Sequence, residues 1–429
     1  MVAKFYLETY GCKLNHADSD IIEGILSKDF KKAGPKDADF FIINSCGVIK
    51  KTEAKIMKRM SKLKRQKKKI ILAGCLPQIS DQKNLFSIAD GAIGPENLLD
   101  IKKVASSVLA GKRIFLLKKD KVDKSRYFKF NEAKKPTKDD VSAIVAISDG
   151  CLGNCSYCAS KFARGELKSF DAENILEYIR HLAGNGFKEI QLTSQDTAAY
   201  GLENGQQSFA TLLEKITEIK GNFKIRVGMM NPGSLKQILD DLILAYKNEK
   251  VYKYLHLPIQ SGDDEILKKM KRPYNTKEIV AMIDKFRESF PDFLFATDII
   301  IGFPGESEKS FAKTLEFVKK IRPHIINITK FSLRPRTEAS SFAQIPEQIK
   351  SKRAKKLIEI SKIIRDKDNR RFIDKTFNVL VVKRGKNNTF IARNESFKAI
   401  ILKKGIVGSE SKAKITGYKT NYLVGKALN

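Results

Sequence analysis

The sequence predicts an α/β protein in three parts: an N-terminal parallel-sheet βαβ domain, a central partial (β/α)6 barrel and a small C-terminal all-β barrel. Strand-like and helix-like patterns alternate before residue 118 and again after residue 140, which predicts parallel strands joined by helices. From Phe377 onward, short strand-like runs separated by glycines predict a small barrel instead. A length of 429 residues accommodates two to three domains of ordinary size.

The first domain is expected to cover residues 1–117. Its elements follow from apolar runs and from helical periodicity. The predicted elements are a strand at Phe5–Tyr10, a helix at Asp18–Leu26, a strand at Asp39–Asn44, a lysine-rich helix at about Thr52–Arg65 and a strand at Lys69–Ala73.

Three cysteines lie just beyond the three predicted strands of this domain. Cys12, Cys46 and Cys75 each follow a strand by one to three residues. Because the carboxyl ends of parallel strands meet at one edge of a sheet, the three thiols are expected to converge there. They form a candidate metal or cluster site. The alternative is that each is an isolated buried cysteine acting as a small hydrophobic residue.

Residues 118–140 are charged and lack apolar periodicity, so they are expected to form a linker. The central domain, residues 141–368, is expected to place its active site at the carboxyl ends of its strands. Its predicted strands are Ala143–Ile147, Glu189–Leu192, Lys224–Met229, Tyr252–Leu257, Phe295–Ile301 and Ile325–Phe331.

The C-terminal module, residues 369–429, is strongly basic. From Arg370 to Asn429 there are 14 Lys and Arg against 3 Asp and Glu. Small basic β-barrels often follow nucleic-acid backbones, so RNA binding is expected; a stabilising appendage with a solvated rim is the alternative. The predicted strands are Asn378–Val382, Thr389–Arg393, Ala399–Ile401 and Ser411–Tyr418.

The whole chain carries 81 Lys and Arg against 49 Asp and Glu, a net charge of +32. This excess indicates a polyanionic partner, because a cationic surface gains by releasing condensed counterions. No run approaches the roughly 18 apolar residues of a membrane span, and no targeting pattern is evident. A soluble, cytoplasmic protein that does not bind membranes is therefore expected.

The most specific signal is Cys151-Leu-Gly-Asn-Cys155-Ser-Tyr-Cys158. One loop supplies three thiolates and no fourth, whereas a closed cubane iron–sulfur cluster normally has four. Three thiolates would leave one iron open to a substrate. Zinc sites prefer two pairs of cysteines, which this chain lacks, and a disulfide is disfavoured where thiols stay reduced.

These features resemble the radical S-adenosylmethionine superfamily, and within it the methylthiotransferases. The Cys151–Cys158 loop, after the first strand of a partial barrel, is similar to the superfamily's cluster loop. The C-terminal module resembles a TRAM domain, and the likeness extends over essentially the whole chain. The sequences that match the methylthiotransferase N-terminal domain are Tyr-Gly-Cys12-Lys-Leu-Asn, Asn-Ser-Cys46-Gly-Val and Ala-Gly-Cys75-Leu-Pro-Gln.

Within that family, the chain resembles the archaeal and eukaryotic branch. That branch converts N6-threonylcarbamoyladenosine next to the tRNA anticodon to its 2-methylthio derivative. Bacterial relatives often carry Ile-Pro after the third cysteine, where this chain has Ala159-Ser160. The matching motifs begin at Lys161 (Lys-Phe-Ala-Arg-Gly), Leu192 (Leu-Thr-Ser-Gln-Asp-Thr-Ala-Ala-Tyr-Gly), Gly228 (Gly-Met-Met-Asn-Pro), Leu255 (Leu-His-Leu-Pro-Ile-Gln-Ser-Gly) and Ala296 (Ala-Thr-Asp-Ile-Ile-Ile-Gly-Phe-Pro-Gly-Glu).

The resemblance implies two [4Fe-4S] clusters. Cys151, Cys155 and Cys158 would hold the catalytic cluster, whose open iron binds S-adenosyl-L-methionine and allows its reductive cleavage to a 5′-deoxyadenosyl radical. The N-terminal cysteines would hold an auxiliary cluster that delivers sulfur. Further candidates to bind S-adenosylmethionine or the modified base are Tyr157, Gln195, Arg226, Gln260, Asp298 and Gly302, for each of which ordinary structure is the alternative.

The expected partner is tRNA through its anticodon stem-loop, with an unidentified electron donor and sulfur source, and a monomer is expected. Two alternatives stay open: a methylthiotransferase for isopentenyladenosine or a ribosomal-protein aspartate, and a non-catalytic iron–sulfur RNA-binding protein. One position departs from the family. Arg336 follows Pro335 where the family usually has glycine, which puts the local turn in question.

Overall fold

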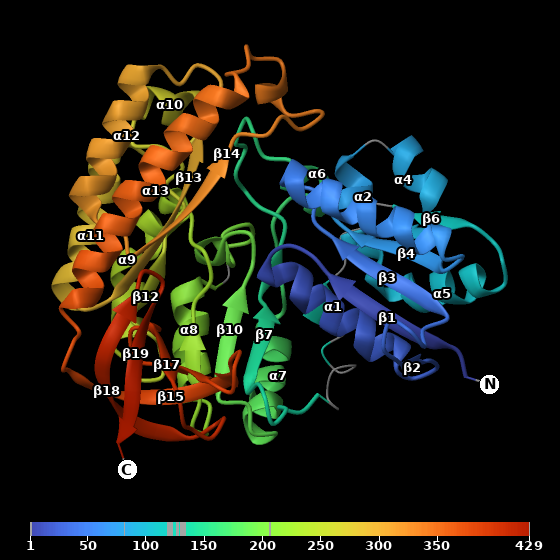
Figure 1. The fold of residues 1–429 in the computed structure, drawn as a ribbon, viewed down its shortest axis with the longest axis horizontal. Coiled ribbons are helices and arrows are strands. Elements are labelled where there is room, and N and C mark those ends of the chain that lie inside the picture. Colours follow the sequence, from blue (N-terminus) through green and yellow to red (C-terminus); the bar gives the residue numbers. More distant parts are fainter. Residues whose placement is uncertain are drawn as a thin grey trace.

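The structure is a computed structural model that describes residues 2–80, 82–117, 123–125, 128, 134–205 and 207–428. The N-terminal sheet domain lies against one side of the central domain, and the C-terminal barrel lies below the central strands (Figure 1). Among the described residues, no helix has the length and apolar character required to cross a bilayer.

The N-terminal domain is a six-stranded parallel sheet in the order β2-β1-β3-β4-β5-β6. The three predicted strands are present within one residue of their expected ends. The three that the sequence analysis missed are only two or three residues long, too short to show a pattern. The strands are β1 (Lys4–Thr9), β2 (Lys31–Lys32), β3 (Phe40–Ser45), β4 (Lys69–Gly74), β5 (Gly91–Ile93) and β6 (Ile114–Leu116).

Two apolar cores cover the two faces of this sheet. α1 and α5 pack on one face. On the other face α2 buries Ile56, Met60 and Leu63, so its lysines lie on the opposite, solvated side. The helices are α1 (Lys13–Leu26), α2 (Lys50–Arg65), α3 (Leu76–Ile79), α4 (Gln82–Ile88), η1 (Pro95–Asp100) and α5 (Ile101–Leu109).

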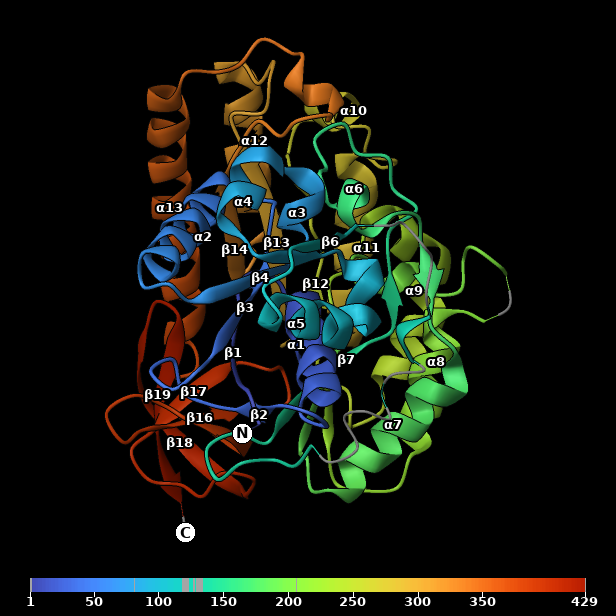
Figure 2. The same ribbon diagram turned by 90° about the vertical axis from the view of Figure 1, so that its right-hand side faces the viewer.

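The prediction for α1 was wrong at its start, because the helix begins at Lys13 rather than at Asp18. The first turn buries Leu14 and Ala17, which belong to the core of the central domain rather than to that of their own domain. The apolar residues of the first turn therefore do not continue the helical pattern of the residues that face the N-terminal core, and the sequence pattern misses this turn. The same contact places α1 against the central sheet (Figure 2).

The six predicted strands of the central domain are present and parallel, as two three-stranded sheets in the orders β11-β10-β7 and β12-β13-β14. Isolated bridges such as Met229 to His256 connect the two sheets. The fold class is thus confirmed as a partial barrel. Its strands are β7 (Ser142–Ala146), β10 (Glu189–Thr193), β11 (Lys224–Arg226), β12 (Tyr254–His256), β13 (Leu294–Ile301) and β14 (Ile325–Lys330), and β8 (Ser148–Asp149) pairs with β9 (Lys168–Ser169).

The longer helices cover the outer face of these strands, and apolar side chains of both form the largest core. They are α7 (Ala172–Gly184), α8 (Phe209–Glu218), α9 (Pro232–Tyr246), α11 (Thr276–Ser289), α12 (Glu308–Ile321) and α13 (Glu347–Arg370). The short helices of this domain are α6 (Ser160–Arg164), η3 (Thr197–Ala199), α10 (Asp264–Lys269) and η4 (Glu338–Ser340).

Much of the predicted linker, residues 118–122, 126–127 and 129–133, lies outside the described residues. Residues 123–125 and 128 are not a solvated tether, because Lys124 and Ser125 are buried and Phe128 belongs to the central core, whereas most of residues 134–140 are exposed. The boundaries of the three predicted domains stay predictions.

The C-terminal module is a closed five-stranded barrel in the order β15-β16-β17-β19-β18. The sequence analysis missed β19, which has Gly425 at its centre where a side chain would normally mark a strand. Crowding explains this glycine, because an added Cβ would lie 3.1 Å from Ile400 and 3.2 Å from Leu402. The strands are β15 (Thr376–Arg384), β16 (Phe390–Arg393), β17 (Ala399–Leu402), β18 (Glu410–Lys419) and β19 (Tyr422–Leu428).

Phe397 anchors this barrel to the central domain. Its ring centroid lies 5.1 Å from that of Tyr252 and 5.2 Å from that of Tyr254, and the Arg226 guanidinium lies 5.9 Å from it. Phe397 also adopts a left-handed backbone conformation with φ of 64°. Such strain persists where surrounding contacts hold it, so the aromatic contacts fix the docking of the barrel.

Replacing Phe397 with alanine is expected to lower the free energy of unfolding by about 2 kcal/mol, because aromatic contacts between the two domains are lost. Urea unfolding of the full chain measures this change. The control is Ile406→Ala, at a side chain that is 76% exposed, which is expected to change little. Equal effects of both substitutions would contradict the anchoring role.

Candidate active site

The three N-terminal cysteines converge as predicted at the carboxyl edge of the sheet. β1, β3 and β4 are adjacent and parallel, and each runs into the loop that carries one cysteine. The loops are tightly packed. A Cβ added at Gly11 would lie 2.6 Å from Cβ of Cys46, and Gly11 has φ of +114°, which favours glycine.

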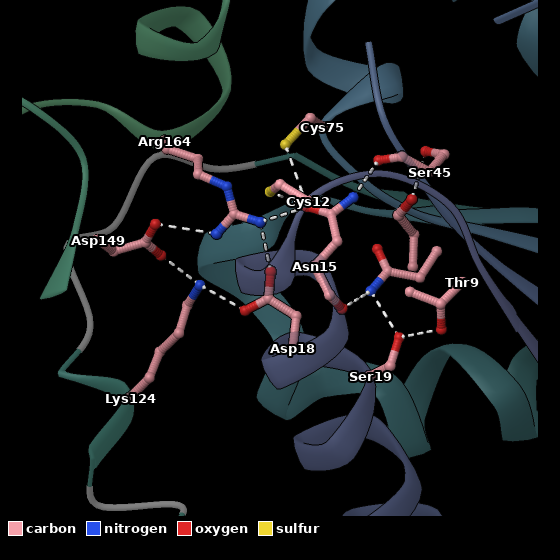
Figure 3. A network of polar contacts seen from close by, with 12 residues as sticks. Thr9, Cys12, Asn15, Asp18, Ser19, Ser45, Cys75, Lys124, Asp149 and Arg164 are labelled. Carbon is pink, nitrogen blue, oxygen red and sulfur yellow. Dashed lines mark hydrogen bonds and ion pairs between the residues drawn. The ribbon is translucent and has the colours of Figure 1, made fainter. Parts of the chain in front are cut away.

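Asn15 lies at the centre of this site. Its Nδ2 donates to the carbonyls of Tyr10 (2.8 Å) and Ser45 (3.1 Å), which fixes the amide between two cysteine loops. Its Oδ1 lies 3.8 Å from Sγ of both Cys12 and Cys75 (Figure 3). Asn15 thus orients two of the three loops. This position suits a residue that orients the ligands of a cluster without binding it.

Burial controls the ionisation of these thiols in the absence of a metal. It raises the pKa of Cys75 to about 12, and the strongest opposing influence is the positive charge of Arg164. Burial likewise raises the pKa of Cys46, opposed by the backbone N–H of Val48 and by Arg164. Metal or cluster binding must therefore release protons from this site.

The second cysteine site is the loop between β8 and α6. The N–H of Gly153 donates to Sγ of Cys151 (3.2 Å), and Nη1 of Arg272 donates to Sγ of Cys155 (3.1 Å). A Cβ at Gly153 would lie 3.3 Å from the Cys151 sulfur and 3.8 Å from the Cys155 sulfur, so glycine keeps the space between the two thiols open.

The chemistry of this loop suits thiolate ligands. Burial raises the pKa of Cys158, while the backbone N–H groups of Ser160 and Lys161 lower it. Cys155 and Cys158 also line a cavity of about 200 Å3 together with Phe162 and Arg336. The loop therefore offers three sulfur donors, N–H groups that stabilise negative charge, and adjoining space.

Each of the two cysteine sites supplies three sulfur donors. A polynuclear iron–sulfur cluster attaches each thiolate to a different iron, so its sulfur ligands need not be grouped around one point. Two sets of three cysteines suit two such clusters.

The two cysteine sites face each other across the interface between the N-terminal and central domains. Cys75 and Ile79, at one side, pack with Ala159 and Ala163, at the other, in a single apolar cluster. α3 follows Cys75 and α6 follows Cys158, so the helices after the two sites are in contact. Both sites therefore open on a shared region.

Arg336 crosses the same interface. Its guanidinium donates to the carbonyl of Gln78 in α3 and lies 4.9 Å from the ring centroid of Phe162 in α6. Its φ of 66° shows that the turn keeps the left-handed conformation that a glycine would adopt. The departure from the family pattern thus preserves the turn and adds a contact between the two cysteine loops.

A ring of four buried charges joins the domains beside these sites. Arg164 pairs with Asp18 (2.5 Å) and Asp149 (2.9 Å), and Lys124 pairs with the same two carboxylates (Figure 3). All four side chains are at most 8% exposed. Burial opposes ionisation of Asp149, but Lys124 and Arg164 outweigh it and lower its pKa. The ring is therefore charged and mutually compensated.

Three of the other predicted site residues are Gln195, Gln260 and Asp298. Gln195 follows β10, and its Oε1 is buried without a hydrogen-bond partner among the described residues, as expected of a group that awaits a ligand. Asp298 accepts hydrogen bonds from His256 (2.9 Å) and Asn327 (2.7 Å), and its carbonyl accepts from the N–H of Gln260, which has φ of +76°.

The remaining predicted residues are held by protein contacts. Tyr157 packs with Phe303, with ring centroids 6.2 Å apart, and Arg226 lies 4.7 Å from the Tyr254 ring on the side of the C-terminal barrel. At Gly302 an added Cβ would meet Lys350 of α13, so the close approach there is by that helix. Ligand binding by all six predicted residues stays a prediction.

Sequence reasoning missed Arg164, Arg272 and Asp196. Arg272 also bonds the carbonyl of Pro258 and Oδ1 of Asn231, and Asp196 accepts from the N–H of Asn231. Arg272 and Asp196 are distant from Cys155 in the sequence, and Arg164 is distant from the N-terminal cysteines, so only the folded chain brings each to its partners. No local signal marked Arg164, because the charged residues Lys161, Glu166 and Lys168 surround it in the sequence.

Comparison with known protein families shows to which class of protein this chain belongs. Residues 145–318 match the family described as the radical SAM superfamily, residues 370–428 match the TRAM domain, and residues 4–93 match a family described as uncharacterized protein family UPF0004. The chain is thus a radical S-adenosylmethionine enzyme with a C-terminal TRAM domain, which confirms that resemblance and its iron–sulfur chemistry.

Relatives over the full length define the family. A probable threonylcarbamoyladenosine tRNA methylthiotransferase of Archaeoglobus fulgidus is 46% identical over 98% of this chain and 97% of the relative, and a protein of the same description from Pyrococcus horikoshii is 37% identical over 100% of both. The chain belongs to the threonylcarbamoyladenosine tRNA methylthiotransferase family. A tRNA-2-methylthio-N(6)-dimethylallyladenosine synthase of Thermotoga petrophila is 33% identical over 99% of this chain and 97% of the relative.

Solved structures support the fold alone. The radical S-adenosylmethionine methyltransferase TsrM from Kitasatospora setae aligns with a TM-score of 0.57 at 10% identity, over 79% of this chain and 75% of that one. The cobalamin-dependent radical enzyme OxsB aligns with a TM-score of 0.52 at 11% identity, over 85% of this chain and 56% of that one. The arrangement of a sheet domain beside a partial barrel is therefore shared with distant enzymes.

Gly11→Ala is expected to displace the Cys46 loop and to reduce the iron and sulfide bound after anaerobic reconstitution, because the new Cβ would clash with Cys46. Gly111→Ala is the matched control, since Gly111 also has positive φ (+79°) but nothing lies within 4 Å of an added Cβ. Both variants should lose about 1 kcal/mol of stability from backbone strain. If both bind iron equally, the crowding argument is wrong.

Asp196 gives the fold a pH dependence. Burial raises its pKa to about 6, against hydrogen bonds from Asn231 and Ser234. The folded chain therefore keeps this proton between pH 4 and 6 while the unfolded chain loses it, so this contribution to stability falls as pH rises through that window. From pH 4 to 7 the metal-free protein should lose about 2 kcal/mol relative to Asp196→Asn. Unfolding curves that stay parallel would contradict this.

Proposed function

We propose that this protein converts N6-threonylcarbamoyladenosine next to the anticodon of tRNA to its 2-methylthio derivative, with two iron–sulfur clusters bound at the two cysteine sites. The observation that carries the proposal is the position of both sets of three thiols at one domain interface, joined through α3 and α6. The names of the full-length relatives support the substrate. The chemistry needs both sites near one base.

The chain's residues would divide the work between the two sites. Cys151, Cys155 and Cys158 would hold one cluster, with Arg272 donating to the Cys155 sulfur and the Gly153 N–H to that of Cys151. When bound there, a reducible cluster and S-adenosylmethionine supply the radical that attacks an unactivated carbon–hydrogen bond. Gln195, with its unpartnered buried Oε1, is placed to accept a hydrogen bond from the cofactor.

Cys12, Cys46 and Cys75 would hold the second cluster, which would supply the sulfur. Asn15 would orient two of the three loops, and Gly11 would let the Cys46 loop approach. The apolar packing of Ile79, Ala159 and Ala163 would exclude water from the contact between the two sites. Exclusion of water protects a radical from side reactions.

The tRNA would be recognised by the TRAM barrel and by the basic charge of the chain as a whole. The barrel segment from Arg370 carries 14 Lys and Arg against 3 Asp and Glu, which suits contact with phosphates rather than with bases. We place the protein in the cytoplasm, where thiols remain reduced and tRNA is available. We propose that it acts as a monomer.

The test uses purified protein, reconstituted without oxygen, and two tRNA substrates that carry threonylcarbamoyladenosine or isopentenyladenosine. Mass spectrometry of nucleosides is expected to find the methylthio group on the first only. The relative from Thermotoga makes isopentenyladenosine (dimethylallyladenosine) the second candidate. Modification of only the second substrate would overturn the proposed substrate but keep the reaction.

Two cysteine variants separate the proposed roles of the sites. Cys12→Ala is expected to retain cleavage of S-adenosylmethionine to 5′-deoxyadenosine and to lose sulfur insertion. Cys155→Ala is expected to lose both, because it removes a ligand of the catalytic cluster. Chromatography of 5′-deoxyadenosine beside the nucleoside assay gives both readouts. Full sulfur insertion by Cys12→Ala would refute the second cluster.

A further inference from the structure

Arg164 reaches from one cysteine site into the other. It is the last residue of α6, the helix that begins two residues after Cys158, and its side chain is 1% exposed. Its Nη2 donates to Oδ1 of Asn15 at 2.7 Å (Figure 3). That oxygen lies 3.8 Å from Sγ of Cys12 and of Cys75, so through Asn15 the Arg164 guanidinium is connected to two thiols of the other domain.

The position of this guanidinium is fixed on three sides. Asn15, Asp18 and Asp149 each accept a hydrogen bond from it, at 2.7, 2.5 and 2.9 Å. A planar guanidinium held by several acceptors has little freedom to move. The chain therefore maintains a positive charge at one point beside the N-terminal thiols.

Charges interact strongly in a buried site because solvent screens them weakly. Arg164 is hydrogen-bonded to Asn15, whose Oδ1 contacts the Cys12 and Cys75 thiols, so its charge acts on this site at close range. A cluster bound to thiolates is anionic, and each added electron makes it more so. Nearby positive charge and hydrogen bonding therefore raise the reduction potential of such a cluster.

We propose that Arg164 is a positioning residue for the proposed N-terminal cluster, which it holds against the catalytic cysteine loop and whose reduction potential it sets through a fixed buried charge. The inference rests on the proposed function, because it requires a cluster at Cys12, Cys46 and Cys75. It adds a residue of the central domain to the site of the N-terminal domain. The two sites are then one composite structure rather than two neighbours.

Lys124 offers a matched control. It belongs to the same buried ring, carries the same charge and pairs with the same two carboxylates. Its hydrogen bonds go to Asp18 and Asp149, whereas Arg164 also donates to Asn15 beside the thiols. Loss of either cation leaves the ring with the same charge imbalance, but only the loss of Arg164 removes the hydrogen bond to Asn15.

The experiment is a redox titration followed by electron paramagnetic resonance, on protein in which Cys151, Cys155 and Cys158 are replaced by alanine so that only the N-terminal cluster can form. Arg164→Gln is expected to shift the midpoint potential to a more negative value. Lys124→Gln is expected to shift it clearly less. Arg164→Lys, which keeps the charge, is expected to stay near the parent value, and it carries the comparison if Arg164→Gln does not fold.

Each outcome decides a different point. Equal shifts in Arg164→Gln and Lys124→Gln, or no shift in either, would overturn the role of Arg164 while leaving the second cluster intact. A shift in Arg164→Lys as large as that in Arg164→Gln would also overturn it. If the parent protein of this series takes up no iron or sulfide, the second cluster itself fails, and the role of Arg164 fails with it.

Discussion

The arrangement of the molecule depends on the buried ring of Asp18, Lys124, Asp149 and Arg164. Its members come from four segments of the chain, namely α1, the segment before β7, strand β8 and helix α6. Removal of one partner from a buried set of charges costs roughly 3–5 kcal/mol, because a charge is left uncompensated. Such a ring specifies one relative placement of the domains, whereas apolar contacts alone tolerate sliding.

A reaction that uses two cysteine sites requires the two domains to be held in one fixed relative position. A parallel sheet brings three loops to one edge, and a partial barrel carries its reactive loop at the same kind of edge. The N-terminal domain presents its edge to the open side of the barrel, and α3 packs on α6. The sheet geometry thus explains why each site has three thiols, and the interface explains why the two sites meet.

The sequence predicted the parts of the fold and the cysteine sites because their signals are local. Apolar runs mark the strands, and each cysteine follows a strand or lies in one short loop. The residues that connect the sites were not predictable in this way. Arg164, Asp18 and Asp149 meet through tertiary contacts, and the first turn of α1 was missed because Leu14 packs on the core of another domain. The five-stranded barrel was predicted with only four strands. The missed strand has a glycine, Gly425, at its centre, because the side chains of β17 leave little room for a Cβ there.

Hydrogen–deuterium exchange of the metal-free full chain, compared between the natural protein and Asp18→Asn, tests the central claim most directly. If the ring joins the two cysteine sites, the substitution in α1 will accelerate exchange both in residues 13–26 and in residues 159–165 of the central domain. Faster exchange confined to residues 13–26 would show that the two sites are held independently, and would contradict this account.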